Sequence, residues 1–489
     1  MKKILPGLAG VLMMAFMFSC QKGIDPVTGT TDTTGTTTPS QLDLLRDSIY
    51  LYTKEVYLWH SLLPSYDQFN PRQFTGSTDL EAAQNEMTSI RSYAPEDKSH
   101  SYSFVVTNEE SDGLQTGESK DWGFLVKGAY IDQAAPYDSV RWFVNYVYKN
   151  SSAGLVGVTR GWILSKINNT ALGYDDASIS LLNSTFFGST SSANFEFTKP
   201  DGTTQAIDLS TTSFTENSVL YSHVYNSDDG TKKIGYVVFN QFLGEPSRTE
   251  LNTVFTDFKS QGISELIVDL RYNGGGSTAT QETFAELIAP ASTNGKTMYT
   301  YYFNDSLQAD KFPLLQAKYG YANGSFKSEN NVVTFENSGG LNLSHVFFIV
   351  SGQTVSASEL LINNLKPYMD VKLIGDTTYG KPVGFFPISI FDYSIYPVSF
   401  KTANSVGNTD YFSGFPPDKL SPDGVNKDWG DVDEPCLYYA LKYINTGSFR
   451  MISASDRKND ALMKVQQQLD PVMRSINSHK FNGMFKEKK

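Results

Sequence analysis

The residues best placed to do chemistry are a serine and a lysine, Ser356 and Lys381, which stand 25 positions apart. A serine hydroxyl becomes a strong nucleophile when a base removes its proton. A lysine is such a base when burial or a nearby cation keeps its amine neutral. The pair therefore predicts acyl transfer through a nucleophilic serine. Taken alone, however, a serine at a helix start is also a common N-cap, and a lysine in a turn is commonly a solvated charge.

The elements around the two residues would bring them together. An apolar run at residues 346–350 predicts a buried strand, and the helical spacing of SASELLINNL places Ser356 at a strand-to-helix junction. A second apolar run, residues 371–374, leads into the turn that ends at Lys381. Because parallel strands joined by one helix end side by side, the serine and the lysine should meet. The N–H of Ala357, at the positive end of the helix, could stabilise an oxyanion there.

Three separate motifs resemble the C-terminal processing peptidases, also called tail-specific proteases. They are SASE beginning at Ser356, TYGK ending at Lys381, and DLRYNGGG at residues 269–276. In that family a serine of S-A-S-E is the nucleophile and the lysine of T-F/Y-G-K is its base. The resemblance therefore implies a serine endopeptidase with a Ser-Lys dyad, a fold similar to crotonase and ClpP, and no cofactor.

The glycine loop of the third motif has a role in this family as well. There, a glycine N–H completes the oxyanion hole, which points to Gly275 or Gly276, with Gly275 preferred. A phosphate-binding loop is rejected because no Gly-Lys-Ser/Thr follows the glycines. Asp269 and Arg271, just before them, are predicted to form a structural ion pair.

The peptidase domain is predicted over residues 213–450 as an α/β core. Its first strand (234–239), a helix (246–260) and a second strand (265–270) form a βαβ unit, which favours a mostly parallel sheet. Residues 291–340, rich in Tyr, Asn and Gly, are expected to form an insertion that covers the site. Residues 451–489 read as a polar tail with helical parts and receive no role.

Short apolar runs between turns predict a β-rich module over residues 113–212. The run from Gly154 to Asn168 is similar to one found in bacterial PDZ domains. Such domains bind a peptide as an added strand and hold its terminal carboxylate on backbone N–H groups, for which Trp122, Gly123 and Phe124 are the candidate loop. The alternative is a β-domain that serves only for packing.

The N-terminal part carries the signals of export. Residues 1–20 have a basic start, an apolar middle and a final FMFSC, which resembles a bacterial lipoprotein signal peptide with Cys20 as the acylated residue. Plain signal cleavage or an accidental apolar start is the alternative. Residues 21–40 are predicted to be a flexible tether and residues 41–112 a small helical domain. We therefore expect a protein anchored by lipid in the cell envelope.

Composition limits the remaining classes of function. The net charge of −12 offers no basic stripe for nucleic acid, and the five histidines lack the spacing of a metal site. If Cys20 carries lipid, Cys436 is left without a disulfide partner and is expected to be a buried structural thiol. The predicted partners are proteins with exposed C-terminal tails and the membrane. The sequence does not indicate an oligomeric state.

Two positions depart from the family pattern. Phe385 stands where many members have a glutamine that orients the lysine, and Pro382 replaces a common glycine. A second hypothesis is therefore an inactive relative that binds peptide tails or apolar ligands. A third, a glycan-binding surface lipoprotein, draws on the 28 tyrosines and ranks last because it leaves the dyad unexplained.

Overall fold

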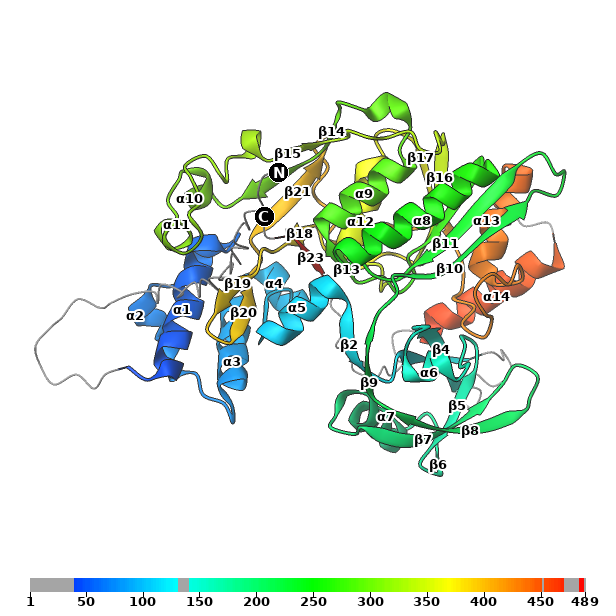
Figure 1. The fold of residues 1–489 in the computed structure, drawn as a ribbon, viewed down its shortest axis with the longest axis horizontal. Coiled ribbons are helices and arrows are strands. Elements are labelled where there is room, and N and C mark those ends of the chain that lie inside the picture. Colours follow the sequence, from blue (N-terminus) through cyan, green and yellow to red (C-terminus); the bar gives the residue numbers. More distant parts are fainter. Residues whose placement is uncertain (1–38, 131–139, 451–452, 470–482, 488–489) are drawn as a thin grey trace, which may run out of the picture.

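The computed structural model describes residues 39–130, 140–450, 453–469 and 483–487 of the chain (Figure 1). The predicted signal peptide, Cys20 and nearly all of the predicted tether lie outside the described residues. Within the described part, no helix has both the length and the apolar character that crossing a bilayer requires.

A six-stranded sheet forms the centre of the molecule. Its order is β10-β11-β12-β16-β17-β22, and every neighbouring pair except β10 and β11 is parallel, as the βαβ pattern predicts. The strands are β10 (Val219–Asn226), β11 (Lys233–Phe239), β12 (Glu265–Asp269), β16 (His345–Val350), β17 (Asp370–Gly375) and β22 (Lys419–Leu420). The continuous apolar runs of the inner strands suit a sheet that is covered on both faces.

Helices cover both faces of this sheet (Figure 1). One face carries α8 (Glu245–Gln261), α9 (Thr278–Ile288) and α12 (Ala357–Leu365), and the other carries α13 (Pro435–Thr446). Successive side chains of a strand point to opposite faces, so Phe348 of β16 packs with the first group and Phe347 packs with α13. The sheet is thus held between two apolar cores.

A second sheet, of order β15-β14-β21-β18, packs beside α12. Its strands are β14 (Thr297–Phe303), β15 (Val332–Thr334), β18 (Val383–Gly384) and β21 (Phe400–Asn404). Between β14 and β15 lie α10 (Asp305–Gln308) and α11 (Pro313–Tyr319). Residues 291–340, which show no clear period in the sequence, therefore contribute two strands to a sheet that reaches the loop after Lys381.

The N-terminal segment is mainly helical, as predicted, and begins at a Ser40 N-cap whose hydroxyl accepts from the Asp43 N–H. Its helices are α1 (Gln41–Val56), α2 (Tyr66–Phe69), α3 (Asp79–Arg91), α4 (Pro95–His100) and α5 (Asn108–Thr116). Its strand β1 (Phe104–Thr107) pairs with β20 (Tyr393–Tyr396), which forms a hairpin with β19 (Ile388–Ile390). The segment therefore shares its core with the central domain.

The β-rich module has its own apolar core and a sheet of order β3-β4-β5-β7-β8. Its elements are β3 (Phe124–Tyr130), β4 (Val140–Val147), α6 (Ser152–Leu155), β5 (Ile163–Ile167), β6 (Thr170–Ala171), α7 (Asp176–Phe187), β7 (Ser192–Thr198) and β8 (Thr204–Ser210). The two-stranded ribbon of β2 (Glu118–Asp121) and β9 (Thr212–Thr215) joins it to the rest of the chain.

Two short strands lie close to the candidate site. β13 (Gly275–Ser277) pairs in parallel with β23 (Gly483–Phe485), and α14 (Ala454–Leu469) lies between α13 and β23 in the chain. The remaining elements are 3-10 helices at His60–Leu62, Pro71–Gln73, Ala291–Thr293 and Ser328–Asn330. A strand of three residues is too short to show a periodicity, so β23 could not be predicted from the sequence.

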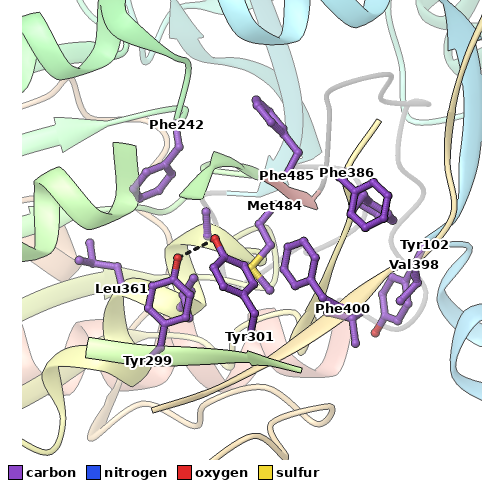
Figure 2. Close-up of a cluster of buried hydrophobic side chains, with 14 of the residues drawn as sticks. Tyr102, Phe242, Tyr299, Tyr301, Leu361, Phe386, Val398, Phe400, Met484 and Phe485 are labelled. Atoms are coloured by element: carbon purple, nitrogen blue, oxygen red, sulfur yellow. Dashed lines mark hydrogen bonds between the residues drawn. The ribbon is translucent and has the colours of Figure 1, made fainter. Parts of the chain in front are cut away.

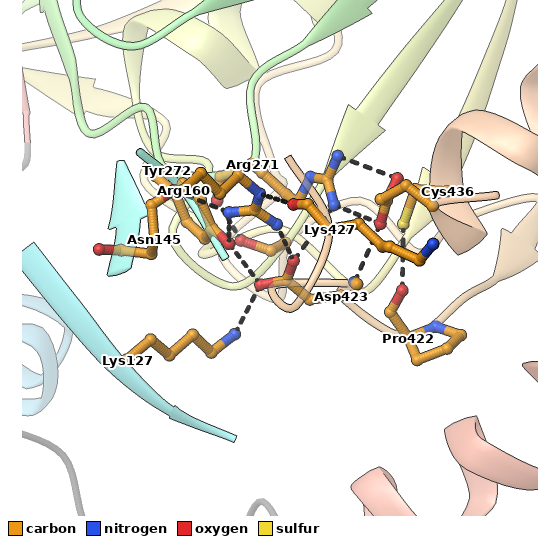
Figure 3. Close-up of polar contacts among 12 residues, drawn as sticks. Lys127, Asn145, Arg160, Arg271, Tyr272, Pro422, Asp423, Lys427 and Cys436 are labelled. Atoms are coloured by element: carbon orange, nitrogen blue, oxygen red, sulfur yellow. Dashed lines mark hydrogen bonds and ion pairs between the residues drawn. The ribbon is translucent and has the colours of Figure 1, made fainter. Parts of the chain in front are cut away.

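A buried network of charges joins the module to the core (Figure 3). Arg271 pairs with Asp269 at 2.6 Å, the ion pair predicted from the sequence, and also with Glu434 and Asp423. From the module, Arg160 donates to Asp423 at 2.9 Å and to the Tyr272 hydroxyl at 2.7 Å. Lys127 of β3 reaches the same Asp423 carboxylate. We call these contacts the module latch.

Cys436 lies beside this network, at the start of α13. It is buried, its thiol donates to the Pro422 carbonyl, and burial raises the pKa of the thiol well above its ordinary value. A thiol held neutral in this way is unreactive. Cys436 is therefore the structural residue that the sequence predicts.

Candidate active site

Ser356 stands at the junction of β16 and α12, where its backbone adopts φ 59° and ψ −103°. Non-glycine residues rarely occupy this region, and holding one there costs about 1–3 kcal/mol, which the surrounding structure must supply. The side chain is fully buried, and Oγ has no hydrogen-bond partner among the described residues. By contrast, Ser358, two residues further on, donates its hydroxyl to the Asn273 carbonyl. Of the two motif serines, only Ser356 has an unengaged hydroxyl.

Lys381 follows β17, and its side chain is buried at 1% exposure. Its Nζ lies 4.5 Å from the centre of the Phe385 ring and 4.8 Å from that of Tyr102. Burial lowers the pKa of Lys381 to about 7, although the carboxylates of Asp97 and Glu359 oppose the shift. At neutral pH a large share of the amine is therefore unprotonated, as a general base requires.

Glu359 ties the serine and lysine loops together. Its Oε2 accepts the backbone N–H of Ser356 at 2.9 Å and that of Lys381 at 2.8 Å. Its Oε1 accepts the Gly380 N–H and the Thr378 hydroxyl. Glu359 is fully buried, and burial raises the pKa of its carboxyl group. Because both backbones bind one oxygen, Ser356 and Lys381 are held side by side, as the strand topology predicts.

The predicted contact between the two side chains is not formed in this conformation. Ser356 Oγ makes no hydrogen bond, so none joins it to Lys381 Nζ. The aromatic rings of Phe385 and Tyr102 flank the amine instead. Catalytic hydrogen bonds are often long in the absence of substrate, and a side-chain rotation is enough to change this one.

The glycine loop reaches the same point from the other side. A Cβ placed on Gly275 would lie 3.0 Å from the backbone nitrogen of Ala357, so the two predicted oxyanion donors are neighbours. Both glycines have positive φ, 102° at Gly275 and 136° at Gly276, which requires glycine here. The Gly275 N–H donates to the Asn273 side chain at 2.9 Å, and Gly276 pairs with Phe242.

Comparison with known proteins identifies the domain that holds this site. Residues 233–418 match the model of peptidase family S41. The chain carries an S41 peptidase domain. This match confirms the resemblance to the C-terminal processing peptidases and supports a serine peptidase.

The chain is also similar to several solved structures. A candidate S41 protease from Bacteroides fragilis is 21% identical, with a TM-score of 0.62 over 82% of this chain and 97% of its own, which shows a shared fold. The photosystem II D1 C-terminal processing protease is 15% identical (TM-score 0.45; 79% of this chain, 95% of that one). Mature CPAF is 13% identical (TM-score 0.46; 84% and 99%). No curated protein matches the chain.

Several residues of the S41 site could not be found from the sequence. Glu359 belongs to a recognised motif, but its motif position alone does not show that it binds two loops. Tyr102 comes from the N-terminal segment, and its hydroxyl donates to the Gly380 carbonyl at 2.9 Å. Asn273 precedes the glycines, where its side chain binds both the Phe239 carbonyl and the Gly275 N–H.

The loop of Trp122, Gly123 and Phe124 lies apart from the S41 residues, at the start of β3. The Trp122 indole donates to the Thr185 carbonyl inside the module, and the Gly123 N–H donates to the Asp121 carboxylate. Trp122 and Phe124 nevertheless line a cleft of about 1500 Å³ that also reaches Tyr102, the neighbour of the Lys381 amine. The cleft therefore runs along the module and reaches a neighbour of Lys381, although neither Ser356 nor Lys381 lines it.

The pKa of Lys381 predicts how activity depends on pH. Because the folded-state pKa is about 7, the neutral amine is lost below that value, and kcat/KM should fall about tenfold per pH unit there and level off above it. Initial rates of cleavage of an unstructured protein from pH 5 to 9 would test this. Unfolding curves at each pH serve as the control for stability. A rate that stays constant between pH 5.5 and 8 would contradict the assignment of Lys381 as base.

Proposed function

We propose that the S41 domain is a serine endopeptidase in which Ser356 attacks the peptide carbonyl and Lys381 accepts its proton. The observation that carries the proposal is the shared Glu359 carboxylate, which holds the serine next to a buried lysine whose pKa is about 7. Each feature alone has a structural explanation. Together, within a protease domain, they support a nucleophile and its base.

The reaction proceeds in two halves. Ser356 Oγ bonds to the carbonyl carbon while Lys381 takes the hydroxyl proton, and the protonated lysine then gives that proton to the leaving amine as the C–N bond breaks. Water hydrolyses the acyl-serine in the second half, with Lys381 again as base. The N–H groups of Ala357 and of Gly275 or Gly276 stabilise the oxyanion in both halves. The Gly275 N–H must first leave the Asn273 side chain.

We also propose that the β-rich module is PDZ-like and selects exposed C-terminal tails. Support comes from the cleft, whose lining includes Trp122 and Phe124 of the module and also Tyr102, the ring beside Lys381. A tail held on the backbone near Gly123 would lead the preceding residues toward the S41 site. The Asp121 carboxylate now accepts the Gly123 N–H and would have to leave it before a terminal carboxylate could bind there.

The test uses one unstructured protein with an apolar C-terminus, supplied with either a free or an amidated terminal carboxylate. We expect cleavage of both, at least about tenfold slower for the amidated form at low concentration, because amidation removes the charged hydrogen bond between the terminal carboxylate and the backbone N–H groups. Fragments would be identified by mass spectrometry. Equal rates would reject tail selection and leave the peptidase proposal in place.

The alternative function is binding without hydrolysis. It is favoured by the aromatic ring of Phe385 against the lysine amine, where a glutamine is common in the family, and by the missing Oγ–Nζ hydrogen bond. Absence of cleavage by the unmodified chain, combined with saturable binding of the same protein, would establish it.

For the location, we propose the cell envelope, with Cys20 as the lipid-carrying residue and the stretch after it as a tether. The support is the signal pattern of residues 1–20. Metabolic labelling with a radioactive fatty acid should mark the chain and should fail to mark Cys20→Ala.

A further inference from the structure

Strand β23 lies in a slot between the two loops that carry the S41 site. On one side it pairs in parallel with β13, and the Gly483 N–H donates to the Gly274 carbonyl at 2.8 Å. On the other side, the Phe385 N–H donates to the Met484 carbonyl at 3.0 Å, and the Lys486 N–H donates to the Phe385 carbonyl at 2.9 Å. A segment from the far end of the chain is thus bound as an added strand, which is how many proteins bind extended peptides.

The side chains of β23 fill an apolar pocket at this slot. Met484 and Phe485 are exposed by 0% and 1%. Figure 2 shows Met484 pointing toward Tyr301 and Phe400. A Cβ added to Gly384 would lie 2.7 Å from Met484 Cγ and 2.5 Å from the Phe400 ring, so this glycine leaves room for the methionine. The pocket is filled by the long unbranched side chain of Met484.

The backbone of β23 passes the predicted oxyanion hole. The point where a Cβ on Gly275 would lie is 2.4 Å from the Gly483 carbonyl oxygen and 3.0 Å from the Ala357 nitrogen. Ala357 directly follows Ser356. The Gly483 carbonyl therefore stands beside the donors that would hold the carbonyl of a substrate.

Polar contacts hold the end of the segment. Arg248 pairs with Glu487 at 2.8 Å, and the Ser277 hydroxyl, next to the glycine loop, donates to the same carboxylate. Lys486 donates to the Asn331 side chain and lies 4.5 Å from the Tyr301 ring centre. These contacts fix the register of β23 on β13.

We propose that β23 occupies the substrate-strand site of the S41 domain and holds the enzyme latent. A substrate would bind there as an extended polypeptide, parallel to β13, with a large apolar residue in the place of Met484. The latency rests on the proposed peptidase function, but the binding of a strand at this site does not require catalysis. Two features accompany the occupied state: the Gly275 N–H is engaged by Asn273, and Ser356 Oγ has no hydrogen bond.

Covalent attachment explains how so short a segment can compete with a free substrate for this site. A tethered segment has an effective concentration on the order of millimolar, so a free substrate must be abundant, or must also bind elsewhere, to displace it. A substrate that is held by the module through its tail gains the same advantage. Latency and tail selection would therefore work together.

The first measurement is hydrogen exchange on the full chain carrying Ser356→Ala. The amides of residues 483–487 should exchange slowly in the free protein. They should lose at least about tenfold of their protection when a synthetic peptide of residues 481–487 is added at several millimolar. The same peptide with Met484→Asp and Phe485→Asp is the control and should leave protection unchanged. Undiminished protection with the first peptide would make β23 a permanent part of the fold and overturn the proposal.

The second measurement compares rates of proteolysis. Full-length Met484→Asp, which places a carboxylate in the apolar pocket, should release β23 and cleave an unstructured protein at least about tenfold faster than the parent. Val406→Asp adds the same charge at a residue that is 75% exposed and should cleave at the parent rate. A folded Met484→Asp protein that is no faster than an active parent overturns latency while the peptidase function stands. Displacement by the peptide without cleavage by any form supports the strand site and rejects the peptidase function.

Discussion

Ser356→Ala is expected to lower the rate of proteolysis by at least about 10³-fold, because it removes the atom that forms the acyl-enzyme. The loss should appear in kcat, since the binding surfaces are untouched. Stability should change little. Oγ makes no hydrogen bond in the described structure, and alanine keeps the Cβ that strains the backbone at φ 59°. Initial rates on an unstructured protein, with unfolding curves for both proteins, measure the two effects.

Ser358→Ala is the matched control, since it removes the other hydroxyl of the same motif. Ser358 is equally buried, and its hydroxyl donates to the Asn273 carbonyl, not toward the lysine. We expect the rate to stay within about tenfold of the parent, with a loss of about 1 kcal/mol of stability from the missing hydrogen bond. If Ser358→Ala were inactive and Ser356→Ala active, the nucleophile would have been assigned to the wrong serine.

Lys381→Met is expected to reduce the rate at least about 10³-fold while it stabilises the fold. Methionine fills similar space without an amine that must be desolvated. The wild-type pKa falls from 10.5 in the unfolded chain to about 7 in the fold, so the unfolded state binds more protons between these values. Wild-type stability therefore rises with pH from about 7 to 10.5. Below pH 7 the wild type bears the full cost of burying the charged amine. The advantage of the variant should be largest below pH 7.

Lys366→Met provides the comparison for Lys381→Met. Lys366 is the C-cap of α12, burial also lowers its pKa, and its Nζ lies 4.0 Å from the centre of the Phe415 ring. It has the same kind of aromatic neighbour without a place at the site, so the variant should cleave at nearly the parent rate. Unimpaired cleavage by Lys381→Met, measured beside this control, would exclude Lys381 as the base.

Local patterns in the sequence predict the frame of the S41 domain closely. The helix expected over residues 246–260 is α8 (Glu245–Gln261), and the strand expected over 265–270 is β12 (Glu265–Asp269). These elements have strong apolar periods that burial in a covered sheet requires. Once the strands are parallel, their carboxyl ends must meet, which is why Ser356 and Lys381 were expected together.

Contacts made by residues far apart in the chain could not be predicted in this way. The Tyr102 ring beside the lysine, and the docking of β23 near the glycine loop, depend on tertiary packing that leaves no local period. The direction of the Gly275 N–H depends on one peptide plane next to residues with positive φ. Motifs identify which residues gather at the site, but rotations of single bonds decide whether they touch.

The module latch has a mechanical consequence for how substrates enter. Arg160 of the module and Asp423 of the central domain are both buried where the two parts meet. The Arg160 guanidinium also lies 4.1 Å from the centre of the Trp429 ring. Moving the module away from the central domain would leave these buried charges without partners, at a cost of several kcal/mol. The latch therefore keeps the module against the core, so a substrate must reach the cleft without the module moving away.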